Sequence, residues 1–270
     1  MNHAGVNRES RENDAIAAKT QAFWNAHPCD GQDTFEALLA YRHAKEPWLP
    51  LLLGKVAASE REVVEVGCGQ GTDGIYMCRL LPAGARYIGL DQSNVSVANA
   101  VSFAEETRHS LKVTPQFRVG DARHLPFDDG SVGAVYSMGV LHHIQNTEGT
   151  IREVHRVLRP GGALYLGLYS TLSAKLLAAH AARAVQSALD WVTGEDRIVL
   201  KRLLSTRFGS RTGTMLHECF GVPILKSYTS HQMRRVLRDF EVTSLASFGS
   251  GNATVRGFGY LWVAIARKPR

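Results

Sequence analysis

EVVEVGCGQGTDG, residues 62–74, is the stretch of this 270-residue chain that decides its fold. Its first five residues are rich in valine and predict a short buried strand. Glycines follow in the spacing GxGxxG, at Gly69, Gly71 and Gly74, and a helical stretch then continues to Leu81. Glycines allow a backbone to approach a ligand closely, and the first amides of a helix are unpaired donors. The stretch therefore predicts a ligand-binding turn between a strand and a helix.

Strands and helices alternate along the rest of the chain. Further strands are predicted at Arg86–Leu90, Gln116–Val119, Val132–Ser137, Ala163–Tyr169, Glu241–Ser247 and Tyr260–Ala266. Helices are predicted between them at Ser93–Thr107, Thr147–Leu158 and Ser230–Asp239. Gly161 and Gly162 are expected to be turn residues only, ahead of the fifth strand. Because parallel strands need crossover helices, the fold class is α/β, with a doubly wound, mostly parallel sheet of the Rossmann-like kind.

The pattern divides the chain into five segments. Residues 1–14 are polar and lack an apolar period, so we expect a flexible tail. Residues 15–57 predict N-terminal helices, the third of them near Leu51–Val56, and residues 58–170 form the binding core. Residues 171–229 predict a helical insert, and residues 230–270 return to the core with a helix and two strands. The insert follows the fifth strand, so it is expected over the carboxyl ends of the strands, where open α/β sheets bind ligands.

Composition narrows the function classes. The net charge is +6, but lysine and arginine are dispersed, so a nucleic-acid partner is not favoured. No apolar run approaches the roughly 18 residues that a membrane span requires, and the N-terminus lacks a signal layout. A cytoplasmic protein without a membrane partner is therefore expected. The four cysteines, Cys29, Cys68, Cys78 and Cys219, show no metal-binding spacing, so no metal is expected.

Two carboxylates discriminate between cofactors. Asp91 lies at the end of the second strand, twenty positions after Gly71, where a carboxylate can accept both hydroxyl hydrogens of a ribose. This layout suits a nicotinamide cofactor and S-adenosylmethionine alike. Glu65 ends the first strand, beside the glycine loop. Its charge would repel a pyrophosphate but attract a sulfonium or an ammonium group, which favours S-adenosylmethionine.

Five motifs in order carry a family resemblance. They are VVEVGCGQGTDG, YIGLDQS, GDARHLPF, VYSMGVLHHI and EVHRVLRPGGALYLGLY, and they cover Glu62 to Tyr169. With them the chain resembles the class I S-adenosylmethionine-dependent methyltransferases, in particular their bacterial small-molecule branch. The resemblance implies seven strands, the last antiparallel and inserted beside the fifth. It also implies methyl transfer from S-adenosylmethionine to an O, N or C atom of a small-molecule acceptor, with S-adenosylhomocysteine as the product.

The resemblance also implies residue roles along the cofactor. Glu65, Gly67 and Gly69 would frame the methionine part and its ammonium group. Met138 would lie close to the sulfonium and the transferred methyl group.

At the other end of the cofactor, Asp91 would hold the ribose hydroxyls and Gln92 would stack beside the adenine. Asp121 would accept from the adenine amino group, and the amide of Ala122 would meet a ring nitrogen.

The N-terminal segment contains an aromatic pair, Phe23 and Trp24, within FWNAHPCD. This element resembles the N-terminal helices of relatives that close over the cofactor, so residues 15–57 are interpreted as a lid. Aromatic faces attract cations, and a dry site protects the reaction. Packing in the hydrophobic core is the alternative for both rings.

Candidates for a general base are expected at the mouth of the site: His142, His143, Tyr169 and His217. Their positions are the only support, and a structural role is the alternative for the histidine pair. The insert is interpreted as a substrate cap, in which Arg207, Arg211 or Lys226 would hold a carboxylate or phosphate of an anionic acceptor.

Other functions stay open at this stage. Methylation of RNA or protein would explain the positive charge, and a non-catalytic regulator could keep the cofactor fold. A dehydrogenase would share the glycine loop. The oligomeric state is not fixed by the sequence, and a homodimer is one option.

Overall fold

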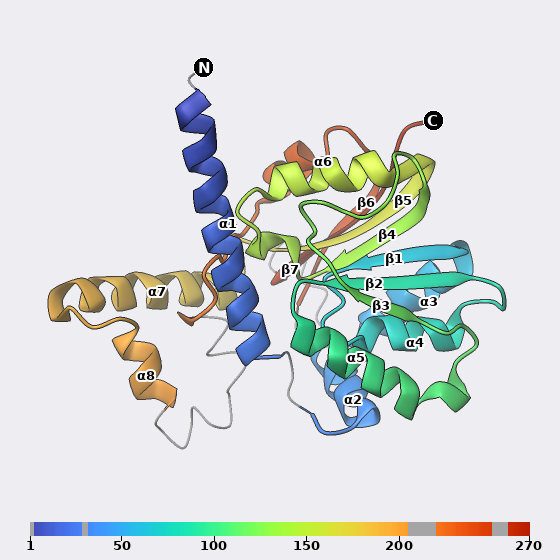
Figure 1. The fold of residues 1–270 in the computed structure, drawn as a ribbon, viewed down its shortest axis with the longest axis horizontal. Helices are drawn as coiled ribbons and strands as arrows, with labels where there is room; N and C mark the ends of the chain where they lie inside the picture. The colour runs from blue at the N-terminus through green and yellow to red at the C-terminus, as the bar shows by residue number, and fades with distance from the viewer. Residues whose placement is uncertain (1–2, 29–31, 205–219, 250–258) are drawn as a thin grey trace.

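The computed structural model describes all residues except 1–2, 29–31, 205–219 and 250–258 (Figure 1). A seven-stranded sheet has the order β3-β2-β1-β4-β5-β7-β6. Its strands are β1 (Glu62–Val66), β2 (Arg86–Asp91), β3 (Gln116–Val119), β4 (Val132–Met138), β5 (Leu158–Tyr169), β6 (Glu241–Phe248) and β7 (Leu261–Arg267). β7 pairs antiparallel with both β5 and β6, and the remaining pairs are parallel. The predicted Rossmann-like sheet, including the strand inserted beside the fifth, is confirmed.

Helices cover both faces of the sheet. One face packs against α3 (Leu49–Ser59) and α4 (Thr72–Leu80), which bury Leu53, Val56 and Met77. On the same face α5 (Asn94–Glu106) contacts β2 and β3, and α2 (Phe35–Lys45) packs against α4; a short 3-10 turn follows α5 at Arg108–Ser110. The other face packs against α6 (Thr147–Val157) and α10 (Ser230–Val236). The core is therefore two apolar layers divided by the sheet.

Two segments differ from their predicted form. α1 runs from His3 to Ala26, so residues 3–14 are helical and the predicted tail was wrong there. These residues include good helix formers such as arginine, glutamate and alanine, and Asp14 is anchored by an ion pair with Arg123 at 2.9 Å. The fifth strand starts at Leu158, five residues early, because the expected turn at 159–162 is an irregularity within β5. Gly161 has a φ of +75° there, which glycine adopts without strain.

The insert forms an arm. α7 (Ala174–Thr193) starts near the carboxyl ends of β4 and β5 and extends away from the sheet, and α8 (Ile198–Leu204) folds back beneath it (Figure 1). Among the described helices, none combines the length and apolarity that a bilayer crossing requires.

Candidate functional site

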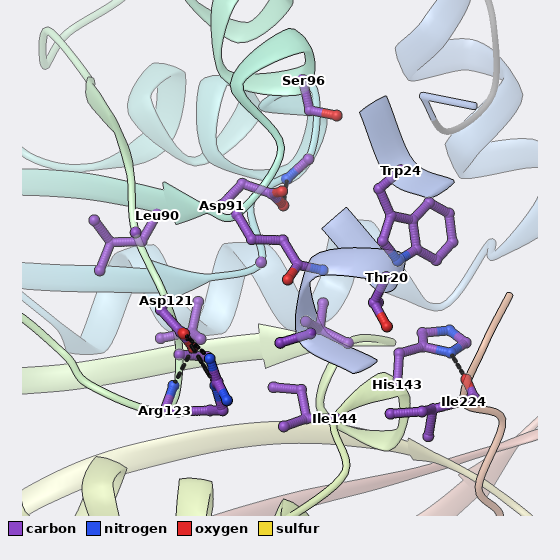
Figure 2. Close-up of a pocket in the computed structure, with 18 of the residues that line it drawn as sticks. Thr20, Trp24, Leu90, Asp91, Ser96, Asp121, Arg123, His143, Ile144 and Ile224 are labelled. Atoms are coloured by element: carbon purple, nitrogen blue, oxygen red, sulfur yellow. Dashed lines mark hydrogen bonds and ion pairs between the residues drawn. The ribbon is translucent and has the colours of Figure 1, made fainter. Parts of the chain in front are cut away.

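Two adjoining cavities lie at the carboxyl ends of β1, β2 and β4. The first has an open volume of about 930 Å³, and Figure 2 shows its walls. The second has an open volume of about 900 Å³. Six residues line both cavities, so the two are continuous: Trp24, Gly67, Gly69, Gly139, Val140 and His143.

The glycine loop forms the floor between the cavities. The amides of Gly67 and Cys68 donate to the carbonyl of Leu90 at 2.7 and 3.0 Å, which fixes the loop against β2. Gly67 has a φ of +80°, and a Cβ there would lie 2.3 Å from a methyl group of Val140. At Gly69 a Cβ would meet nothing within 4 Å. The backbone of Gly69 is therefore open to a ligand, as the sequence predicted for this turn.

Asp91 stands at the end of β2 and lines the first cavity. One carboxylate oxygen accepts from the amide of Gly69 and the other from the amide of Ser93, both at 2.8 Å. Burial raises the pKa of Asp91, while these two amides oppose the rise. Each carboxylate oxygen can accept a second hydrogen bond. Two neighbouring hydroxyl groups are ligands that this carboxylate could hold.

Asp121 also lines the first cavity, but Arg123 holds its carboxylate (Figure 2). The backbone amide and the guanidinium of Arg123 donate to the two oxygens at 2.7–3.1 Å. Burial would raise the pKa of Asp121, but these bonds and the arginine charge outweigh it and lower the pKa. Arg123 also pairs with Asp14 of α1 at 2.9 Å. An exocyclic amino group would therefore have to share Asp121 with Arg123.

The wall opposite these acids is largely apolar. Ala122, Val140 and Ile144 line the first cavity, and Ala17 of α1 faces them from the N-terminal side. Gln92 lines it as well, and its carbonyl accepts from the side chain of Gln21 at 2.7 Å. This second tether holds α1 over the cavity. A mostly apolar compartment beside an acid that could accept hydrogen bonds from two hydroxyl groups suits a nucleoside.

Buried charges surround the second cavity. Asp73 of α4 accepts two hydrogen bonds from the guanidinium of Arg42, both at 3.1 Å, and one from the Tyr136 hydroxyl at 2.7 Å. Glu65 is 4% exposed and accepts a hydrogen bond from the Tyr87 hydroxyl. Burial raises the pKa of Glu65 well above its usual range, and the charge of Asp73 adds to the rise. A cation bound in this cavity would stabilise the ionised form of Glu65.

The aromatic pair of α1 is divided. Trp24 lines both cavities, and its ring centroid lies 5.4 Å from that of His143 in an edge-to-face arrangement. Phe23 is 8% exposed and lines neither cavity, and its ring packs 5.0 Å from Trp24 and 5.1 Å from His27. Adjacent residues on a helix point about 100° apart, so only one of the two could face the site. The expectation for Phe23 as a cofactor-facing ring is corrected to a packing role.

The two neighbouring histidines differ in their access to the site. They lie on a 3-10 turn, Leu141–His143, with 4.2 Å between their ring centroids, but only His143 lines the cavities. The Nδ1 atom of His143 lies 2.7 Å from the carbonyl oxygen of Ile224, so Nδ1 carries the proton and Nε2 is the basic nitrogen. Burial lowers the pKa of His143 to about 4, so this ring is neutral near pH 7. His143 lines both cavities and can accept a proton there.

His142 lies behind the site. It is fully buried, lines neither cavity and stacks on Tyr169 with 3.8 Å between the ring centroids. Neither of its ring nitrogens has a hydrogen-bond partner among the described residues, and burial lowers its pKa well below the usual value. Tyr169 itself lines the second cavity. The structure therefore brings His143 and Tyr169 to the site, while His142 supports the ring of Tyr169.

The remaining predicted residues fall in several places. Met138 and Glu65 line the second cavity, and Ala122 lines the first. Lys226 is half-buried and donates from its ammonium to the carbonyl of Gln145. His217, Arg207 and Arg211 lie outside the described residues. Across the described ranges, no group of histidine, cysteine or carboxylate side chains is arranged to hold a metal.

One group of charged residues at the site was not predicted from the sequence. Arg42, Lys45 and Glu46, at the end of α2, line the second cavity. Arg42 pairs with Glu46 at 2.8 Å as well as with Asp73. The signal was present, because Arg42 continues the buried stripe of Leu38 and Leu39 at helical spacing. A charge in line with an apolar face indicates a buried ion pair rather than a solvated side chain.

Residues 64–166 match the profile of the family described as "Methyltransferase domain". The chain is similar to phthiotriol/phenolphthiotriol dimycocerosates methyltransferase 1 of Mycobacterium ulcerans, 37% identical over 117 residues, which cover 43% of this chain and 40% of the relative. It is also similar to 27-O-demethylrifamycin SV methyltransferase of Amycolatopsis mediterranei, 31% identical over 105 residues, which cover 39% of this chain and 37% of the relative. The chain thus spans less than half the length of these curated relatives.

Solved structures share the fold over nearly the whole chain. One is 1,6-didemethyltoxoflavin-N1-methyltransferase of Burkholderia thailandensis, crystallised with 1,6-didemethyltoxoflavin and S-adenosylhomocysteine. The TM-score is 0.59 at 15% identity, and the match covers 95% of this chain and 90% of that one. At this identity the match concerns the fold.

Proposed function

We propose that this chain, which matches a methyltransferase domain at residues 64–166, is a class I S-adenosylmethionine-dependent methyltransferase that methylates a small-molecule acceptor. One observation carries the proposal: two cavities of different chemistry meet at the glycine loop. The first is apolar with a diol-binding acid, Asp91, and the second holds the buried carboxylate Glu65. A nucleoside joined to a cationic amino acid needs both.

The residues present fit S-adenosylmethionine on the evidence of the open backbone at Gly69, where a Cβ would find empty space. When bound, this group supplies an electrophilic methyl on a sulfonium. In the proposal, Asp91 accepts hydrogen bonds from the ribose hydroxyls, and Ala122 and Gln92 lie along the adenine. Glu65, Gly67 and Gly69 hold the ammonium end, and Met138 lies near the sulfonium. The two positive charges of Arg42 and Lys45 suit the carboxylate end.

Trp24 is the residue of α1 that serves this site best. Its ring lines both cavities at their junction, where the sulfonium would lie, so it can stabilise the cation through its face and exclude water. The contacts of Gln21 with Gln92 and of Asp14 with Arg123 fasten the same helix over the first cavity. Of the predicted lid, residues 15–57, α1 then covers the site and α2 contributes to the wall of the second cavity, whereas α3 belongs to the core; α7 and α8 act as the cap of the acceptor side.

His143 is the proposed general base. Its Nδ1 proton is held by Ile224, so Nε2 can take the proton that an acceptor hydroxyl or ammonium loses. Its pKa of about 4 keeps the ring unprotonated at neutral pH, although it also makes the ring a weak base. Tyr169 lines the same cavity and would contact the acceptor. The enzyme would otherwise act by alignment, which can supply about 7–11 kcal/mol.

A small acceptor fits the second cavity better than a polymer does. Its walls come from α1, α2 and the ends of β4, β5 and β7, so it is enclosed by several elements of the fold. Relatives named for 27-O-demethylrifamycin SV and norajmaline support a small molecule as the acceptor of this chain. Lys226 donates to the carbonyl of Gln145, so its ammonium would have to leave this bond to hold an anionic acceptor.

Titration calorimetry with S-adenosylhomocysteine tests the cofactor site, and Asp91→Ala is the variant that should lose affinity for this ligand. Mass spectrometry of metabolite extracts incubated with methyl-labelled S-adenosylmethionine then tests turnover. His143→Gln should keep cofactor affinity and lower kcat about 100-fold or more if His143 is the base. Failure to bind S-adenosylhomocysteine would refute the whole proposal. Binding without any labelled small molecule, but with labelled RNA or protein, would refute the acceptor class alone.

A further inference from the structure

The outward face of α7 is exposed and apolar. All residues of this helix are described, and its exposed positions include Leu177 at 54%, Val185 at 57%, Trp191 at 87% and Val192 at 71%. None of its exposed residues is charged, since Lys175, Arg183 and Asp190 are only partly accessible. Solvated helix faces ordinarily carry charged residues, so a face of this kind marks an interaction surface.

The opposite side of α7 fixes this face outward. Leu176, Ala179 and Gln186 are buried against the chain's own residues. The side chain of Gln186 donates to the carbonyl of Phe220 at 3.2 Å and accepts from the amide of Leu200 at 3.2 Å. Arg183 donates to the carbonyl of Val222 at 2.9 Å. The helix cannot turn its apolar face inward without breaking these bonds.

Within this face one seam has the spacing of a heptad repeat, and Val185 and Val192 lie beside it. Six exposed residues fall at alternating steps of three and four, which is the seam of a helix pair: Ala174, Leu177, Ala181, Ala184, Ala188 and Trp191. Four of the six are alanines, which allow two helix backbones to approach closely. Twenty residues make α7 about 30 Å long, enough for nearly three heptads.

The seam is complementary to itself in one orientation. If a second α7 lies antiparallel, with the two-fold axis between residues 182 and 183, Trp191 faces Ala174 of the other copy and Leu177 faces Ala188. Ala181 then faces Ala184. Each large side chain meets a small one, as close packing requires, and the contact is isologous, as in a two-fold dimer. A parallel pair would instead place Trp191 against Trp191.

We propose that the outward face of α7 binds the same face of a second copy of this chain in an antiparallel helix pair. An anionic membrane suits this face less well. Its exposed residues include no lysine or arginine, and the exposed acids Glu195 and Asp196 follow directly after the helix. The proposal does not depend on the acceptor or on turnover.

Light scattering coupled to gel filtration tests the proposal on the full chain. We expect twice the 29.6 kDa of one chain for the unmodified protein, and a shift to a single chain mass for Ala181→Glu. The matched control is Ala98→Glu, the same change at an exposed position of α5, which should stay dimeric. Binding of S-adenosylhomocysteine by each variant, at unmodified affinity, shows that the fold is kept.

A second variant fixes the orientation. In Ala181→Glu/Ala184→Lys, an antiparallel pair brings each introduced carboxylate to an introduced ammonium of the other copy, so the dimer mass should return. In a parallel pair like charges would meet and the chain would stay monomeric. A monomeric unmodified protein, a dimer that Ala181→Glu leaves intact, or no recovery in the double variant would overturn the proposal. So would flotation of the unmodified protein with phosphatidylserine vesicles that Ala181→Glu abolishes.

Discussion

Replacing Asp91 by asparagine removes one of two carboxylate oxygens that each accept a hydrogen bond from a backbone amide. In the protein, the two carboxylate oxygens accept from the amides of Gly69 and Ser93, both at 2.8 Å. Asparagine keeps one acceptor oxygen and turns an NH₂ group toward the other amide. One hydrogen bond to a charged group is lost, which is worth about 1.5–3 kcal/mol. Burial already raises the pKa of Asp91, so removing its charge offsets part of the loss.

The free energy of unfolding should therefore fall by only about 1.5 kcal/mol in Asp91→Asn. The affinity for S-adenosylhomocysteine should fall much more, because the loop at Gly69 and the ribose contact depend on the same carboxylate. A loss of about 2 kcal/mol in binding corresponds to roughly a 30-fold rise in Kd. Urea denaturation measures the first quantity, and titration calorimetry measures the second.

Asp121→Asn is the comparison variant. Asp121 lines the same cavity, but its oxygens are occupied by Arg123. Its substitution should raise Kd less than about five-fold, since the adenine shares this acceptor with an arginine. If Asp91→Asn binds S-adenosylhomocysteine as well as the unmodified protein does, or if Asp121→Asn is the weaker binder, the assignment of Asp91 to the ribose is refuted.

Three further outcomes are expected. Trp24→Ala should weaken binding of S-adenosylmethionine about 5- to 30-fold more than that of S-adenosylhomocysteine, whose sulfur is uncharged, since a desolvated cation–π contact is worth about 1–2 kcal/mol. Equal losses of affinity in calorimetry would contradict a ring over the sulfonium. His143 has a pKa lowered from 6.5 to about 4 in the folded protein, so protons bind the unfolded chain first and stability falls as pH drops through this window. Between pH 7.5 and pH 5, the free energy of unfolding measured by urea denaturation should fall by about 2 kcal/mol more in the unmodified protein than in His143→Gln. Equal decreases in the two proteins would contradict the lowered pKa of His143. Gly74→Ala would place a Cβ 1.8 Å from the Tyr87 hydroxyl and should lower the free energy of unfolding by about 3 kcal/mol or more. In Gly69→Ala the Cβ meets no atom within 4 Å, and the φ of +52° should cost only about 1–2 kcal/mol. Equal urea midpoints for the two variants would refute the packing argument.

Local signals sufficed for most of the sheet. Valine-rich runs bounded by glycine, such as Glu62–Val66, carry their strand assignment in their own composition. The start of β5 was predicted late, because Pro160 and Gly161 signal a turn in sequence while the sheet continues around them. The start of α1 was missed because an apolar period is a signal of burial. Residues 3–14 form a helix but lack an apolar period in their sequence, so that signal is absent.

Within the site, the sequence located the glycine loop and the acid at the end of β2 because both lie inside one strand–turn–helix unit. It did not find the pairing of Asp121 with Arg123, since two residues of one loop can point in many directions. Nor could the sequence tell which of His142 and His143 faces the site, because the two are adjacent on the same 3-10 turn. Side-chain direction in a short turn is set by tertiary contacts, here the carbonyl of Ile224 for His143.

The ion pair between Arg42 and Asp73 has a consequence for how this protein could be taken apart or recombined. Asp73 lies inside the stretch that matches the family profile, residues 64–166, while its buried counter-charge comes from α2, outside it. A buried carboxylate stripped of its partner costs about 3–5 kcal/mol. The boundary of the family match is thus not a boundary of folding. A chimera that takes the catalytic stretch from one relative and the N-terminal helices from another would fold stably only if the residues at positions 42 and 73 could still form this ion pair.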